Sequence, residues 1–281
     1  MKKDKQELPK IIWFLWFQGL KKAPYVVKKC LASWKIHNPE WKVIFLSEKS
    51  IKEYINLEEI MGENYQYASK QALSDIIRIN LLKKYGGVWV DSTCFCCKPL
   101  DSWLNNYMTT DFFAFYRPNI DKPISSWFLV SYLDSQLTSK YCEETNLYWS
   151  KNCFSNQKNK IAKFCVKRIT RVIKNISYKL PGFFTFFLLT KPFKVYPYFW
   201  FHYIFVSIIK TDKSCHKEWE AMNKYSASIP HKLSHYGFFN PLSEQIKSYI
   251  DKKKAPLYKL TWKYDESNYK KDCTLYYLLE Q

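Results

Sequence analysis

The segment between residues 72 and 93 constrains the fold more than any other part of the sequence. Apolar residues recur there at helical spacing, two adjacent glycines then interrupt the helix, and the apolar run Val88 to Val90 predicts a short buried strand. This strand ends on Asp91. Because ligand sites in α/β proteins lie at the carboxyl ends of strands, we expect Asp91 to face a crevice and not a core.

Further polar side chains accompany Asp91. Asp75 and Arg78 are three residues apart, so they share one face of the predicted helix that leads into this strand. The hydroxyls of Ser92 and Thr93 follow the strand directly. The alternative is that Asp75 and Arg78 form an exposed ion pair, which would contribute little to the stability of the fold. We favour a binding role, since their helix leads straight to Asp91, and a polar, anionic ligand fits the charges.

The same segment resembles a known motif. The run S-D-x-x-R-x-x-x-L-x-x-Y-G-G-x-W-x-D-x-T, residues 74–93, is similar to the nucleotide-sugar motif of the DXD-containing GT-A glycosyltransferases. That family includes yeast α-mannosyltransferases, clostridial glucosylating toxins and bacterial capsular polysaccharide synthesis proteins. PKIIWFLWFQG at 9–19 resembles its first strand, and YFWFHYIF at 198–205 and PLYKLTWK at 256–263 are similar to the capsular polysaccharide branch. Only residues 74–93 are chemically specific.

The order of the predicted elements agrees with this resemblance. Strands at 11–17, 42–46 and 88–90 alternate with helical segments, which predicts an α/β fold with a mostly parallel sheet. The resemblance implies a GT-A Rossmann-like fold with a nucleotide-sugar-binding core at 1–144. Residues 145–281 are expected to form a mainly helical acceptor-side lobe that is not an independent domain. The pattern after Trp127 predicts a helix up to Leu133.

The resemblance also implies an activity. We expect a hexosyltransferase that moves a sugar from a nucleotide-sugar, in the first place a UDP-sugar, to a glycan on a lipid carrier during bacterial capsule or exopolysaccharide synthesis. Retention of the anomeric configuration is implied by the family alone. Two alternatives stay open: an inactive relative that binds glycan or membrane, and a sugar-phosphate transferase of capsule pathways. No P-loop, G-x-G-x-x-G or G-x-S-x-G motif is present, which argues against kinase and hydride-transfer chemistry.

Roles for individual residues follow from the resemblance. Asp75 matches the family residue that binds donor hydroxyls, and Arg78 matches the one that contacts the sugar or its phosphate. Asp91 is the expected metal ligand or ribose contact. Trp16, at the end of the first predicted strand, could stack on the base, although core packing explains it equally well.

A divalent cation, Mn²⁺ or Mg²⁺, usually neutralises the diphosphate of such donors. The sequence departs from the family pattern here, because Thr93 stands where the second motif Asp would be, and a neutral hydroxyl is a weaker ligand than a carboxylate. By analogy with GT-A enzymes, a later histidine could complete the site, and the candidates are His202, His231 and His235. We therefore predict Asp91, Thr93 and His231 as the ligands, with metal dependence in doubt.

The composition of the 281-residue chain favours a reduced, globular protein. Hydrophobic residues make up 47%, enough for a sizeable core. The odd count of nine cysteines indicates free thiols, and C-x-C-C at 94–97 lacks the spacing of a structural zinc site. The apolar run after MKKDKQELPK is predicted to be a strand and not a signal peptide. No uninterrupted apolar run reaches the roughly eighteen residues that a membrane span needs. The predicted location is the cytoplasm.

The net charge of +19 is unevenly distributed, since residues 145–211 contain twelve Lys and Arg but no Asp or Glu. Residues 160–176 predict an amphipathic helix with one basic face and one apolar face, interrupted only by Phe164. Such a helix could lie on an anionic membrane, here the inner face of the cell membrane, or dock its apolar face on the protein core. Both alternatives stay open. We expect no nucleic-acid partner, because no nucleic-acid-binding module is recognisable.

Overall fold

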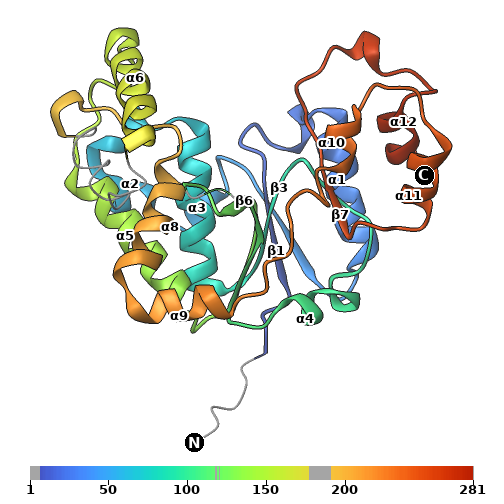
Figure 1. Ribbon diagram of the computed structural model, residues 1–281, viewed down its shortest axis with the longest axis horizontal. Helices are drawn as coiled ribbons and strands as arrows, with labels where there is room; N and C mark the ends of the chain where they lie inside the picture. Colours follow the sequence, from blue (N-terminus) through green and yellow to red (C-terminus); the bar gives the residue numbers. More distant parts are fainter. Residues whose placement is uncertain (1–6, 118, 120, 177–190, 281) are drawn as a thin grey trace, which may run out of the picture.

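The computed structural model describes residues 7–117, 119, 121–176 and 191–280, and Figure 1 shows their arrangement around one central sheet. The sheet has five strands in the order β2-β1-β3-β6-β5. Strand β1 pairs in parallel with β2 and β3, whereas β6 runs antiparallel to both β3 and β5. Four of these five strands therefore share one direction, and the expected mostly parallel sheet is confirmed. The strands are β1 Ile11–Leu15, β2 Lys42–Leu46, β3 Gly87–Asp91, β5 Phe112–Tyr116 and β6 Ile124–Ser131.

The two faces of the sheet carry separate hydrophobic cores. Because side chains alternate along a strand, Trp13 and Trp89 belong to one core, and Phe14 and Val90 belong to the other. We call the face of Trp13 the α3 side and the face of Phe14 the β7 side. The α3 side is covered by α2 Leu57–Met61, α3 Lys70–Tyr85, α5 Gln136–Lys151, α8 Trp200–Thr211 and α9 Lys213–Ala221.

The β7 side is built from three separate parts of the sequence: an N-terminal helix, two short elements that follow β3, and the C-terminal segment. Its elements are α1 Tyr25–His37, β4 Cys94–Cys96, α4 Leu104–Tyr107, α10 Lys232–Tyr236, α11 Glu244–Asp251, β7 Leu257–Lys259 and α12 Thr274–Leu279. Strands β4 and β7 form a second, two-stranded antiparallel sheet. In Figure 1 the helices of the α3 side lie on the left and those of the β7 side on the right. The C-terminal half thus contributes to both faces.

The turn from α3 into β3 depends on glycine. Helix α3 begins after Ser69, whose side chain accepts a hydrogen bond from the Ala72 amide, and it ends at Gly86. Gly87 has φ +89°, and a Cβ atom there would lie 2.5 Å from the carbonyl oxygen of Ile11. Any other residue would push β3 away from β1. The glycine pair therefore fixes where α3 ends and where Asp91 is presented.

One predicted element was wrong. The segment from Trp127 to Leu133 was expected to be helical, but most of it belongs to β6. Its large apolar residues are buried on both faces of the sheet, between β3 and β5. A strand buried on both faces has a continuous apolar sequence without alternation, so a short run of this kind does not distinguish strand from helix.

The amphipathic helix was predicted correctly as α6, Lys160–Ile176, which extends away from the rest of the molecule at the upper left of Figure 1. Its apolar face is partly covered: Val166 is 4% exposed, whereas Ile161 is 75% exposed. Phe164, on the basic face, is 60% exposed. Among the described residues no helix is long and apolar enough to span a membrane.

The predicted division of the chain after residue 144 falls inside α5. That helix packs against α3, α8 and α9, so residues on either side of this position share one core. The assignment of residues 145–281 to the acceptor stays a prediction. The three cysteines of the C-x-C-C segment are buried free thiols.

Candidate functional site

Asp91 lies at the carboxyl end of β3, in the middle of the sheet, as the sequence predicted. It pairs with Leu15 at the end of the neighbouring parallel strand β1. Because β6 runs in the opposite direction, its amino end reaches the same edge. The Asp91 side chain is 28% exposed, so it is accessible from the solvent-facing end of the sheet.

Arg78 reaches Asp91 from the α3 side. Its Nη2 atom lies 3.3 Å from Asp91 Oδ1, and its Nη1 atom lies 3.1 Å from Asp75 Oδ1. Arg78 also donates to the Ser126 carbonyl oxygen at 2.6 Å and to Ser74 Oγ at 3.0 Å. With its side chain only 6% exposed, Arg78 is a buried cation that fixes two carboxylates. The structure therefore brings together the three charged residues that the sequence singled out.

Trp89 holds the same carboxylate oxygen. Its Nε1–H donates to Asp91 Oδ1 at 3.0 Å, and its ring lies 5.1 Å from the Arg78 guanidinium carbon. Oδ1 of Asp91 thus receives hydrogen bonds from both Arg78 and Trp89.

Lys259 reaches Asp91 from the β7 side, and sequence reasoning missed it. Its Nζ atom lies 3.3 Å from Asp91 Oδ2 and 2.6 Å from Thr93 Oγ1. The pairing of β7 with β4 places Lys259 directly opposite Cys94, next to Thr93. The segment PLYKLTWK was singled out for its family resemblance, and the one basic residue inside its strand was the signal that could have identified Lys259.

The charges around Asp91 act on its pKa in opposite directions. Burial raises the pKa of the Asp91 carboxyl, but the Lys259 and Arg78 charges and the Trp89 hydrogen bond together outweigh burial and hold the pKa below its ordinary value. For Asp75, burial dominates over the attraction to Arg78 and raises the pKa to about 7. Asp91 is therefore a permanent anion at neutral pH, whereas Asp75 can exchange a proton.

His231 lies against Trp127 and not against a carboxylate. The two rings meet edge to face at 5.5 Å, and His231 Nδ1 is 3.3 Å from Ser234 Oγ. Burial and the nearby charges of Arg117, Lys259 and His235 lower the pKa of His231 to about 4. Its Nε2 atom is buried and has no hydrogen-bond partner within the described part of the chain.

The other two candidate histidines are placed differently. Burial and the charges of Arg78, Lys122 and Arg117 lower the pKa of His202 to about 3. His235 stacks on the His231 ring at 6.0 Å. The charge of Arg117, which directly follows β5, contributes to the lowered pKa of both His202 and His231.

The donor atoms at this edge do not fit a divalent cation. Both oxygens of Asp91 already accept from cationic side chains, and Thr93 supplies a neutral hydroxyl that contacts Lys259. No cluster of three or more His, Cys, Asp or Glu side chains suited to a metal occurs within residues 7–117, 119, 121–176 and 191–280. Mg²⁺ is usually held by one or two carboxylates together with waters and substrate phosphates, and the carboxylate available here, Asp91, is already engaged by Arg78 and Lys259. The combination of Asp91, Thr93 and His231 stays a prediction that this geometry does not support.

Trp16 lies at the edge of the sheet where β1 and β3 end, as the sequence suggested. It directly follows Leu15, and its ring meets Trp262 edge to face at 5.4 Å. Trp262 is 44% exposed. The Nε1 atom of Trp16 is buried and has no hydrogen-bond partner in the described residues. A role for Trp16 in base stacking stays a prediction.

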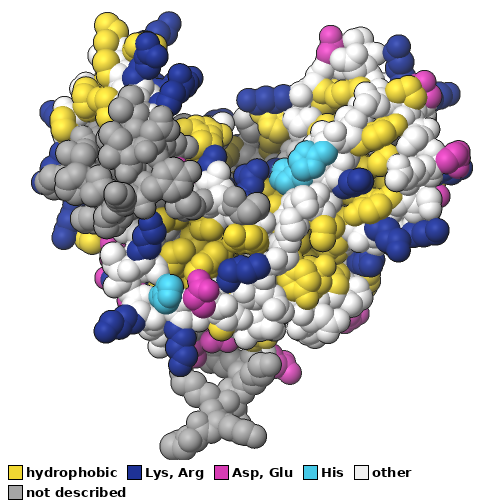
Figure 2. Space-filling model, viewed as in Figure 1, with side chains coloured by type: hydrophobic (Ala, Val, Ile, Leu, Met, Phe, Trp, Pro, Cys, Tyr) yellow, Lys and Arg dark blue, Asp and Glu magenta, His cyan; other side chains and the backbone are white. Residues whose placement is uncertain are grey.

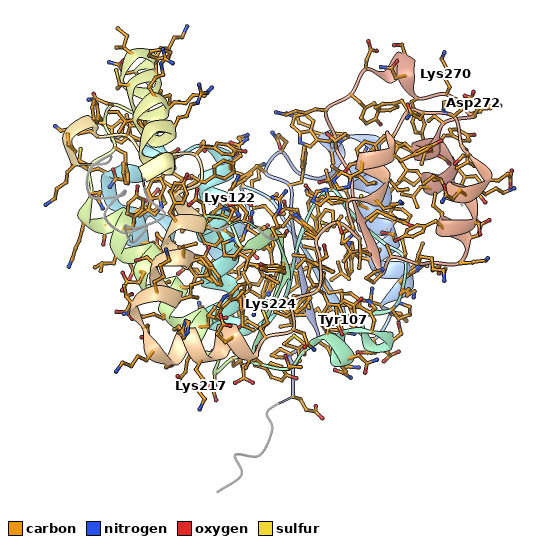
Figure 3. All side chains as sticks on the ribbon, in the orientation of Figure 1. Tyr107, Lys122, Lys217, Lys224, Lys270 and Asp272 are labelled. Carbon is orange, nitrogen blue, oxygen red and sulfur yellow. The ribbon has the colours of Figure 1, made fainter. Side chains whose placement is uncertain are left out.

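The surface above this edge is hollowed and basic. Figure 2 shows a depression between the two sides of the molecule, bordered by Lys or Arg and by His side chains. Figure 3 places Lys122, from the connection between β5 and β6, beside the same region on the α3 side. An anionic ligand is the natural occupant of a depression with this charge.

Sequence comparison decides the family. A family model described as "Capsular polysaccharide synthesis protein" matches residues 1–279. The chain belongs to that family. No curated protein matches this family member. Among solved structures, "PaToxG Glycosyltransferase" is similar at a TM-score of 0.38 and 13% identity, over 71% of this chain and 84% of the other. A similarity of this size supports no conclusion about activity.

Proposed function

We propose that this member of the capsular polysaccharide synthesis family is a GT-A-type hexosyltransferase that uses a nucleotide-sugar donor, with a UDP-sugar as the first to test. The observation that carries the proposal is the charged cluster of Asp75, Arg78, Asp91 and Lys259 at the carboxyl end of the central strand. A nucleotide-sugar offers both hydroxyls for the carboxylates and a diphosphate for the cations.

The proposed reaction breaks the bond between the anomeric carbon and the diphosphate oxygen, and its electron pair leaves with the diphosphate. A new bond forms between the anomeric carbon and an acceptor hydroxyl, whose proton passes to the departing diphosphate. Asp91 accepts hydrogen bonds from donor hydroxyls, and Arg78 keeps Asp91 and Asp75 in position. Retention of configuration is part of the proposal and rests on the family resemblance.

The nucleotide that the protein releases distinguishes this function from the two alternatives. We expect the full-length protein to release UDP, or another nucleoside diphosphate, from one member of a nucleotide-sugar panel. Release of UMP would instead identify a sugar-phosphate transferase, and release of neither would indicate a protein that only binds glycan or membrane. Asp101→Asn is a suitable control, because this carboxylate pairs with Lys10 on the surface.

The proposed acceptor is a growing glycan on a lipid carrier, which places the enzyme at the inner face of the cell membrane. Helix α6 supports peripheral contact, because Ile161 and Phe164 are exposed beside a basic face. Lys160 and Lys163 lie in the same first turn and are exposed as well. Anionic headgroups would contact these lysines while the two apolar side chains enter the interface.

A further inference from the structure

The Lys259 ammonium lies in the position that a motif-bound cation would take. It bridges Asp91 Oδ2 at 3.3 Å and Thr93 Oγ1 at 2.6 Å, the first and third positions of the D-x-D-like motif. A divalent ion shared between these two side chains would have to occupy the same space. The chain therefore already supplies one positive charge at this point.

The backbone fixes this charge in place. Lys259 pairs with Cys94 in the β4–β7 ladder, and its own amide donates to the Pro230 carbonyl oxygen at 3.0 Å. The amide of Leu260 donates to the Thr93 carbonyl oxygen at 2.7 Å. Hydrogen bonds on both sides of Lys259 thus hold its strand against the motif, so the ammonium reaches Asp91 without a long flexible loop.

The ammonium also retains capacity for a ligand. A lysine ammonium has three donors, and its two hydrogen bonds in the described structure go to Asp91 and Thr93. The Lys259 side chain is 18% exposed, three times the exposed fraction of Arg78 at 6%. Lys259 can therefore donate to an oxygen on the solvent side of Asp91, which the enclosed Arg78 cannot do.

The local charge balance points to the same role. Asp91 is one carboxylate between two cations, Arg78 and Lys259, so a divalent ion added there would meet like charge and a carboxylate whose two oxygens are already engaged. A diphosphate would instead add negative charge beside Lys259. Arg117, exposed at the end of β5, adds a further positive charge at this edge.

We propose that Lys259 replaces the divalent cation of this site and neutralises the diphosphate of the nucleotide-sugar donor by direct contact with its oxygens. This proposal rests on the proposed transferase function and specifies how that function is carried out. In the reaction, the Lys259 ammonium stabilises the charge that the diphosphate gains when its bond to the anomeric carbon breaks. Transfer then proceeds without Mn²⁺ or Mg²⁺.

The first experiment measures binding of UDP, GDP and dTDP to the full-length protein by calorimetry, in EDTA and in Mn²⁺. We expect one nucleotide to bind the wild type equally well in both conditions. Lys259→Gln should weaken this binding at least about tenfold, a loss of about 1.4 kcal/mol, and Lys259→Arg should recover most of it. Lys254→Gln is the matched control, because Lys254 is exposed in the loop before β7. Thermal unfolding of each variant verifies its fold.

A second experiment restores a metal-binding motif by removing the lysine and adding a second carboxylate. In the double variant Thr93→Asp with Lys259→Ala, two carboxylates face each other across the motif and no ammonium lies between them. We expect Mn²⁺ to strengthen nucleotide binding at least about tenfold in this variant and to have no effect on the wild type.

The outcomes separate the two proposals. Nucleotide binding and turnover by the wild type only with Mn²⁺ would overturn the role of Lys259 and leave the transferase function intact. Equal binding by Lys259→Gln and wild type in EDTA would also overturn it. Absence of nucleotide binding by the wild type in both conditions would overturn both proposals.

Discussion

The two sides of the sheet each contribute one cation to Asp91, but they hold it differently. On the α3 side, Arg78 is 6% exposed and contacts Asp75, Asp91, Ser74 and Ser126. On the β7 side, Lys259 is 18% exposed and contacts Asp91 and Thr93. Arg78 is therefore buried among the residues of the α3 side, whereas Lys259 is exposed enough to contact a ligand.

This difference separates two tasks that a charged cluster can perform. Arg78 keeps the carboxylates in a fixed geometry, because removing it would leave buried negative charge without compensation. Removing Lys259 should cost the protein less packing than removing Arg78, and should reduce its ability to bind an anion more. We therefore expect substitutions on the α3 side to affect stability first, and substitutions at Lys259 to affect donor binding first.

The largest expected effect belongs to the residue that both sides share. Asp91→Asn removes the charge between Arg78 and Lys259 with almost no change in volume. We expect kcat/KM for nucleoside diphosphate release to fall at least about 1000-fold, or about 4 kcal/mol, while Asp101→Asn has no effect. Activity close to wild type in a folded Asp91→Asn protein would remove Asp91 from the site.

Arg78→Ala tests the structural half of the comparison. Loss of one partner of a buried ion pair costs about 3 kcal/mol or more, so the midpoint of thermal unfolding should fall by several degrees. Catalytic efficiency should also fall by about tenfold or more, because Asp75 and Asp91 lose their orientation. Lys84→Ala, at an exposed position on the same helix, is the control. A larger loss of stability in Lys259→Gln than in Arg78→Ala would reverse the comparison.

A third prediction concerns α6, the basic helix that Figure 1 shows next to the helices of the α3 side. Lys163→Gln with Lys167→Gln should weaken binding to anionic vesicles by about 2 kcal/mol, at about 1 kcal/mol for each charge. Salt should have the same effect, because the Debye length shrinks from about 10 Å at 0.1 M to about 3 Å at 1 M. Co-sedimentation with anionic and neutral vesicles measures both.

Lys252→Gln with Lys254→Gln is the matched control for the vesicle experiment, since both lysines are exposed on the β7 side. Turnover of a short soluble acceptor should stay unchanged in both pairs. Equal binding of the wild type to both vesicle types, or no binding to either, would leave α6 as a helix docked on the protein.

The last prediction is a pH dependence of stability. The Asp75 pKa of about 7 in the folded state lies above its ordinary value of 3.8, so the folded protein retains a proton that the unfolded chain releases between these values. Stability should therefore decrease as the pH rises through this window, by at most about 1.4 kcal/mol per pH unit. The groups that face Asp75 are Arg78 on α3, Asp91 on β3, Tyr141 on α5 and Tyr196 before α8.

Asp75→Asn should abolish this contribution. We expect the difference in unfolding temperature between variant and wild type to grow from pH 4.5 to pH 7, in favour of the variant. Asp91, whose pKa is lowered, titrates below this window and does not interfere. A difference that stays constant with pH would show that Asp75 keeps its ordinary pKa.

The α3 side was largely predictable from the sequence, because its site residues are close together in the chain. Helical spacing placed Asp75 and Arg78 on one face, and the glycine pair placed Asp91 directly after the helix. The strand Lys42–Leu46 and the helix Lys160–Ile176 were also predicted with their observed bounds.

The β7 side was less predictable, because its contribution depends on pairing between distant segments. Nothing near Thr93 in the sequence indicates that Lys259 will pair beside it, since the pairing of β4 with β7 depends on tertiary packing. The same applies to β6, whose apolar run becomes a strand only because β3 and β5 lie on either side of it. His231 was proposed as a ligand by analogy with GT-A enzymes and without knowledge of its surroundings, and packing places it against Trp127.

The separation of the two cations along the chain has a consequence for how the protein folds. Arg78 precedes Asp91 by 13 residues, whereas Lys259 follows it by 168. Closing the longer loop costs more conformational entropy, so we expect the local contact to form at an earlier stage of folding than the distant one. On this expectation Asp91 pairs with Arg78 before it pairs with Lys259. If Lys259 binds the diphosphate as proposed, the site can bind its donor only after β7 has paired with β4, which ties competence for the donor to completion of the fold.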